Sequence, residues 1–131
     1  MIEINNLTTV PLNEEFLKKI SSKVLEKENR GIADLSIVLV GQGRIRALNK
    51  KYRGKNRVTD VLAFPGNGLG EIVICLREVK KNAKRFNLVF EKELARVLIH
   101  GILHLLGYDH EKSEIEAKKM KEKEEYYLSQ I

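Results

Sequence analysis

The sequence is poor in the residues that mark disulfide-bonded and membrane proteins. Its single cysteine, Cys75, excludes an intramolecular disulfide. Cys75 lies in an apolar run, which favours a small buried side chain over a metal ligand or a nucleophile. No apolar run approaches the roughly 20 residues of a membrane span. The first residues lack the basic and apolar regions of a secretory signal. We therefore expect a cytoplasmic protein without a membrane partner.

The chain has 131 residues, which is enough for one domain with a hydrophobic core and too few for two. Apolar residues alternate or repeat with helical spacing in the order strand, helix, strand, helix, two strands and three helices. The strands are expected to begin at Ile2 and to cover residues 34–40, 58–64 and 71–76, and the helices are expected at 14–27, 45–54, 77–86, from about 91, and 111–128. We predict an α+β fold over residues 1–131, with a roughly four-stranded mixed sheet and about five helices.

Histidine is also scarce, and all three histidines lie between residues 100 and 110. His100 and His104 are four residues apart, so on a helix they share one face. Gly107 follows where that helix must end, since glycine takes a left-handed conformation without a steric clash. The chain can then turn back and offer His110 as a third ligand. Three imidazoles around one point, with a fourth position open, predict one catalytic zinc ion per chain at the end of a helix.

The spacing His-x-x-x-His-x-x-Gly-x-x-His is also the ligand pattern of the metzincin proteases. Those enzymes carry a glutamate directly after the first histidine, and this glutamate is the general base. Here that position is Gly101, which cannot accept a proton. The pattern therefore supports a metal site and argues against a metalloprotease.

Basic residues dominate two stretches of the chain, whose net charge is +6. No acidic residue interrupts the first stretch, which contains Arg44, Arg46, Lys50, Lys51, Arg53, Lys55 and Arg57. The second stretch contains Arg77, Lys80, Lys81, Lys84 and Arg85, with only Glu78 opposing. Such clusters are typical of proteins that bind phosphate-rich partners.

A phosphodiester suits a zinc centre, because its cleavage needs activated water and neutralisation of charge. Arginine binds two phosphate oxygens at once, so Arg53 is a candidate phosphate ligand. Asp60, Glu71 and Asp109 are candidates for orienting water, although Asp109 can instead support its neighbour His110.

Four segments together resemble the YbeY family of bacterial ribosomal RNA maturation factors. They are residues 48–55 (Asn-x-x-Tyr-Arg), 59–65 (Thr-Asp-Val-Leu-Ala-Phe-Pro), 70–74 and the histidine segment 100–110. Two positions depart from the family pattern, since Ala63 stands for its usual serine and Glu71 for its usual aspartate.

The resemblance implies a metal-dependent endoribonuclease that cleaves single-stranded RNA in the maturation of the small ribosomal subunit. It implies zinc bound by His100, His104 and His110, and a functional Arg53 in the cleft. Glu71 keeps the carboxylate of the family's aspartate, although its side chain is longer. From the resemblance we expect Arg53 and Glu71 to be catalytic residues.

One alternative stays open beside a metalloprotease: a ribosome-assembly factor that binds RNA and uses its metal for structure. A closed ligand sphere would favour that alternative, and Cys75 is the only thiol that could close it. The sequence does not indicate the oligomeric state or which metal is bound, since imidazole also suits other transition metals.

Overall fold

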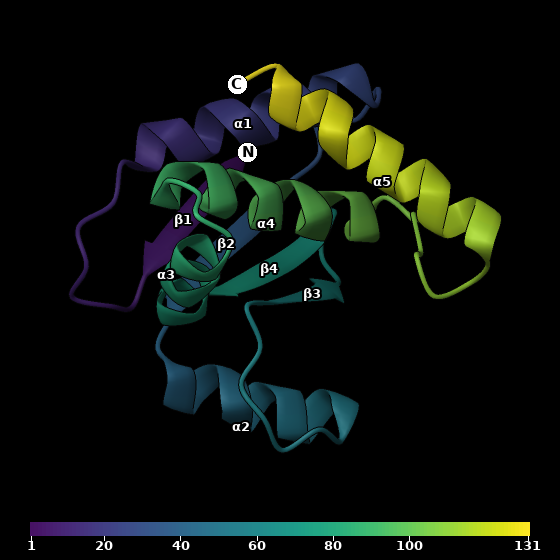
Figure 1. Cartoon of the computed structure of the whole chain (residues 1–131). Coiled ribbons are helices and arrows are strands. Elements are labelled where there is room, and N and C mark those ends of the chain that lie inside the picture. The colour runs from purple at the N-terminus through teal and green to yellow at the C-terminus, as the bar shows by residue number, and fades with distance from the viewer.

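Four strands form one mixed sheet in the computed structural model, which describes residues 1–131 (Figure 1). They are β1 (Ile2–Asn6), β2 (Leu35–Val40), β3 (Val61–Pro65) and β4 (Gly70–Cys75), in the order β1-β2-β4-β3. β1, β2 and β4 are parallel, and β3 pairs antiparallel with β4. The predicted mixed sheet is confirmed, and β3 and β4 form a hairpin. β3 begins at Val61 rather than at Val58, because its partner strand ends at Cys75, where a helix begins.

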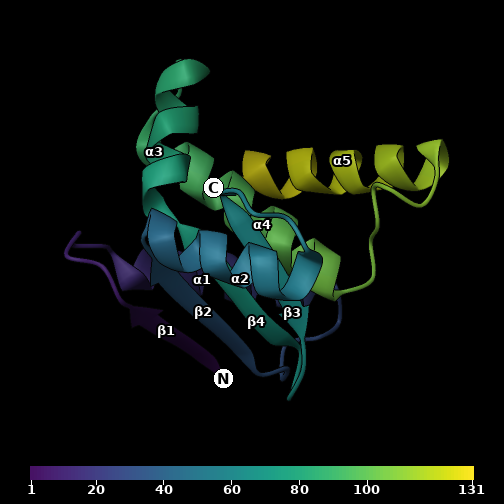
Figure 2. The ribbon, with the colours of Figure 1, turned by 90° about the horizontal axis from the view of Figure 1, so that it is seen from below.

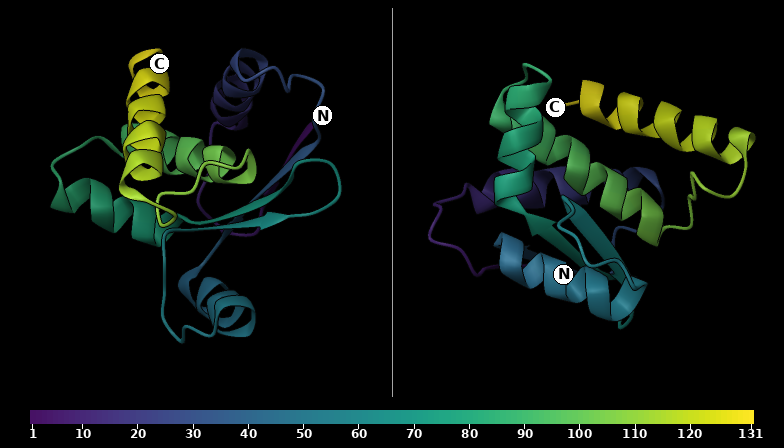
Figure 3. Two further views of the ribbon diagram at one scale, coloured as in Figure 1. Left: turned by 90° about the vertical axis from the view of Figure 1, so that its right-hand side faces the viewer. Right: turned by 60° about the horizontal axis from the view of Figure 1, so that its bottom comes forward.

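Five helices are present, as predicted, and they lie on both sides of the sheet (Figures 1 and 2). They are α1 (Glu14–Lys27), α2 (Gln42–Arg53), α3 (Leu76–Arg85), α4 (Phe90–Leu105) and α5 (Glu114–Ser129). α2 lies alone on one side, whereas α1, α4 and α5 lie on the other (Figure 3). α5 begins at Glu114 rather than at residue 111, because the Ser113 side chain caps it by accepting the Glu116 N–H. None of the helices combines the length and the apolar character that crossing a membrane requires.

Alternate residues of β4 belong to two hydrophobic cores. Ile72 and Ile74 join the main core between the sheet and the helices α1, α3, α4 and α5. Val73 and Cys75 join a smaller core with Ile45 of α2. Cys75 is fully buried, as predicted, and burial raises the pKa of its thiol above the usual value. Because β4 is covered on both faces, it holds α4 and α2 at fixed places on opposite sides of the sheet.

Glu28, directly after α1, ties together segments that are far apart in the sequence. Its carboxylate accepts hydrogen bonds from Tyr108 Oη at 2.8 Å, from Lys123 Nζ at 3.1 Å and from Tyr127 Oη. Burial by itself would raise the pKa of Glu28, but these hydrogen bonds outweigh it and lower that pKa below its ordinary value. Glu28 thus fastens both the segment after α4 and the helix α5 to α1.

The replacement Glu28→Gln is expected to destabilise the protein relative to wild type, and this loss should be larger at neutral pH than at acid pH. The free energy of unfolding should fall by about 2 kcal/mol at pH 7, a typical contribution of hydrogen bonds to a charged group. A carboxyl whose pKa is lowered by folding stabilises the protein above its unfolded pKa, and this contribution disappears as the pH falls through the folded pKa. Urea unfolding between pH 3 and pH 7 measures this difference, with Glu26→Gln at an exposed position of α1 as the control. A constant difference at every pH would contradict the prediction.

Candidate metal centre

The helix α4 carries two of the three histidines on one face. His100 and His104 are one turn apart and half-buried, whereas Leu98, Ile99, Ile102 and Leu103 of the same helix are fully buried. α4 ends as predicted, because Gly107 has a φ of 102°. The Gly107 N–H donates to the carbonyl of His104 and the Tyr108 N–H to that of Leu103, which is the Schellman pattern.

A tight turn after Gly107 returns the chain to the helix. The Asp109 carboxylate accepts the Glu111 N–H at 2.9 Å, and this Asx-turn places His110 beside the other two histidines. The three ring centroids lie 5.4 to 5.5 Å apart. One potential ligand atom from each side chain lies within 4.8 Å of the others, and no fourth side chain belongs to this group.

The environment of the three rings fits a divalent metal. Burial lowers the pKa of His104, and the neighbouring His100 and His110 lower it further. A lowered pKa favours the neutral imidazole, which is the form that binds a metal. Three nitrogen donors suit zinc and leave a coordination position for water or substrate.

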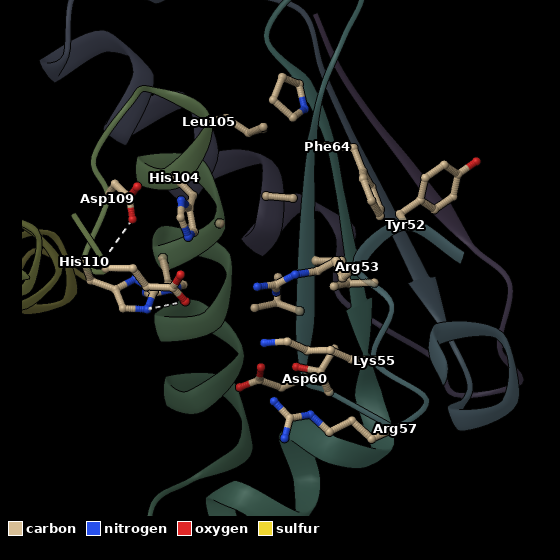
Figure 4. A pocket seen from close by; sticks show the side chains of 18 residues that line it. Tyr52, Arg53, Lys55, Arg57, Asp60, Phe64, His104, Leu105, Asp109 and His110 are labelled. Carbon is tan, nitrogen blue, oxygen red and sulfur yellow. Dashed lines mark hydrogen bonds and ion pairs between the residues drawn. The ribbon is translucent and has the colours of Figure 1, made fainter. Parts of the chain in front are cut away.

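A cleft of about 650 Å³ opens between the three histidines and the segment from Tyr52 to Pro65 (Figure 4). Arg53, Lys55 and Arg57 extend from this segment toward α4 and face the histidines across the cleft. The charged side chains of the lining are Arg53, Lys55, Arg57, Asp60, Asp109 and Glu111. Their formal charges cancel, so a bound divalent ion would make the cleft positive and suited to an anionic ligand.

The structure brings most of the candidate site residues together. His100, His104, His110, Arg53, Asp60 and Asp109 all line the cleft. The Asp60 carboxylate also lies 3.8 Å from the Arg96 guanidinium and accepts a hydrogen bond from Asn82 at 3.4 Å. The cleft therefore combines three potential metal ligands, three basic side chains and three carboxylates, two of which are candidate site residues.

Glu71 is not part of this cleft. It is exposed, and it alternates along β4 with Ile72, whose side chain packs beneath Gly101 of α4. The side chains of successive strand residues point to opposite faces, so Glu71 points away from the histidines. The structure thus does not place the expected catalytic carboxylate at the metal centre.

Other predicted features are also separate from the centre. Cys75 lies in the smaller core and is not a member of the metal-binding group. The second basic stretch lies along α3, and none of its residues lines the cleft. The first stretch is divided, since only its last three members, Arg53, Lys55 and Arg57, reach the cleft.

Gly101 has a packing role as well as lacking a basic group. A Cβ atom at this position would lie 3.0 Å from Cγ2 and 3.2 Å from Cδ1 of Ile72. A glutamate here would begin against the sheet, where it would overpack the core. A side chain at the position where a metzincin carries its base would therefore require Ile72 to shift.

The sequence patterns did not reveal Glu124 as a neighbour of the centre. Its Oε1 lies 2.6 Å from Nδ1 of His100, although the two residues belong to different helices. A signal was present, because Glu124 shares a helix face with Met120 and Tyr127, which are 1% and 3% exposed. A carboxylate in an apolar stripe is expected to have a buried partner.

The sequence is similar to known proteins of one family. Residues 3–131 match the model of a family described as Endoribonuclease YbeY. A relative of that name from Thermodesulfovibrio yellowstonii is 46% identical over 88% of this chain and 80% of its own length. Another from Thermotoga neapolitana is 44% identical over 90% of this chain and 82% of its own length.

The fold is similar to a solved structure, the solution structure of TM1509 from Thermotoga maritima. The TM-score is 0.70 and the identity 41%, over 98% of this chain and 87% of the other. The family match and these identities over most of the chain confirm the resemblance noted in the sequence. The chain belongs to the Endoribonuclease YbeY family.

Proposed function

We propose that this protein is a zinc-dependent endoribonuclease that cleaves single-stranded RNA during ribosomal RNA processing. The observation that carries this proposal is the arrangement of three imidazoles opposite three basic side chains across one cleft. Relatives that bear the name Endoribonuclease supply the reaction class. We further propose that residues 1–131 act as one hydrolase domain in the cytoplasm, on RNA of the small ribosomal subunit.

In this proposal His100, His104 and His110 hold the ion. A divalent ion bound there supplies positive charge that polarises a phosphate oxygen and activates water. Arg53 faces the same space, and its planar guanidinium can bind two phosphate oxygens. Lys55 and Arg57 line the cleft beside Arg53 and add positive charge. They can bind the phosphates on either side of the cleaved bond.

An exposed cleft of this kind favours RNA without a regular helix. Unpaired RNA can bend its backbone into a concave site and present a single phosphate to the histidines, whereas a duplex holds its phosphates on a rigid cylinder. Tyr52, which is 58% exposed, belongs to the cleft lining and offers an aromatic surface next to Arg53.

The test compares zinc-loaded protein on an unstructured RNA, on a fully paired RNA of the same sequence and on an unfolded polypeptide. We expect cleavage of the unpaired RNA to be at least about tenfold faster than that of the duplex, with no peptide hydrolysis. Salt-dependent RNA binding without cleavage would instead support an assembly factor with a structural metal. Peptide hydrolysis that follows the zinc content would overturn the proposal in favour of a protease.

A further inference from the structure

We infer that Glu124 of α5 is a positioning residue for the metal centre, which it serves by orienting His100. This inference rests on the proposed function in one respect, that the three histidines bind a metal. Glu124 lies on α5, whereas the rest of the site comes from α4, from the segment after α4 and from residues 52–65 across the cleft.

The contact between Glu124 and His100 is short and shielded. Oε1 lies 2.6 Å from Nδ1, and the side chains of Glu124 and His100 are only 16% and 23% exposed. His110 approaches Glu111 at 3.8 Å, but there the two side chains are 42% and 68% exposed. Among the three histidines, His100 therefore has the one close and shielded carboxylate partner.

This hydrogen bond determines which nitrogen of His100 can bind a metal. An ionised carboxylate has only acceptors, so Nδ1 must carry the proton and donate it. In a neutral imidazole the other nitrogen, Nε2, then keeps its lone pair. A carboxylate partner also fixes the ring orientation and makes the ligand more basic, which strengthens metal binding.

Glu124 itself is held in place by neighbours on both sides. Lys123 and Tyr127 both donate hydrogen bonds to Glu28, which follows α1. Met120, one turn before Glu124, is buried in the main core. α5, which lies beside α4 in Figure 1, is thus docked by contacts that do not involve the histidines. It presents Glu124 to His100 as a preformed acceptor.

The experiment measures zinc affinity of the purified protein by competition with a chromogenic chelator. Glu124→Gln keeps the shape of the side chain but removes its charge, and we expect zinc to bind about 10- to 100-fold more weakly. Glu122→Gln removes the same charge from an exposed position of the same helix and should change the affinity less than about threefold.

Two further readouts separate positioning from a merely structural role. The increase in Tm that zinc produces should be smaller in Glu124→Gln than in Glu122→Gln, while the metal-free proteins unfold at similar temperatures. In ¹H–¹⁵N correlation spectra of the zinc-loaded protein, the Nδ1–H proton of His100 should give a downfield signal in Glu122→Gln. This proton signal should be shifted upfield in Glu124→Gln.

Each failure has a distinct meaning. Equal zinc affinities for the two variants would overturn the role of Glu124 alone, as would a lower metal-free Tm with an unchanged response to zinc. Wild-type protein that binds no divalent metal would overturn this inference and the metal part of the proposed function together. RNA cleavage is not needed for any of these measurements.

Discussion

His104→Ala is expected to abolish both metal binding and RNA cleavage. His104 is half-buried, and its ring lies 5.5 Å from the rings of both His100 and His110, so its removal leaves only two of the three imidazoles. Metal analysis should show close to one zinc ion in wild type and almost none in the variant. Cleavage of unpaired RNA should fall by at least about a thousandfold, since the ion supplies the charge that activates water.

Metal-free wild type is the matched control for this variant. Wild type stripped by a chelator should be as inactive as His104→Ala, and added zinc should restore only the wild type. Circular dichroism should show the same helix content in all samples, because α4 is held mainly by its buried apolar residues. Cleavage at the wild-type rate by a variant without metal would overturn the metal dependence that we propose.

Arg53→Ala is expected to lower kcat/KM for RNA about a hundredfold, which is typical for the loss of one group that stabilises developing charge. Arg53 points into the cleft toward the histidines, at the place where a phosphate between the two walls would lie. Arg53→Lys keeps the charge but loses the paired donors, so it should recover only part of the activity. Zinc affinity should not change, because Arg53 is not a member of the metal-binding group.

Arg44→Ala distinguishes a specific role of Arg53 from a general effect of charge. Arg44 is exposed on the same helix and does not line the cleft. Its replacement should weaken RNA binding modestly and mainly at low salt, with kcat nearly unchanged. Equal losses of kcat in the two alanine variants would contradict the role assigned to Arg53.

The local parts of this protein were predictable from the sequence. Helical spacing placed His100 and His104 on one face, and Gly107 marked the end of that helix, because both depend on residues within one or two turns. The strands and helices followed from apolar periodicity in the same way. Errors arose at element ends, as at Val61 and Ser113, where a partner strand or a capping side chain decides the boundary.

Contacts between distant segments were not predictable. The resemblance suggested a role for Glu71, but the alternation of side chains along β4 directs it away from the cleft. Glu124 was missed because its partner, His100, is 24 residues away on another helix. The division of the basic stretch, with only Arg53, Lys55 and Arg57 at the cleft, likewise depends on where α2 ends relative to the sheet.

The sequence by itself thus determined the ligand type and the absence of a protease base, since three clustered imidazoles and Gly101 are facts of residue identity and short spacing. Only the tertiary structure decided what faces the histidines and what supports them. The sheet sets Arg53 across the cleft from α4, and α5 brings Glu124 to His100. Packing of the hydrophobic core fixes both arrangements, and it acts between residues whose separation along the chain carries no periodic signal.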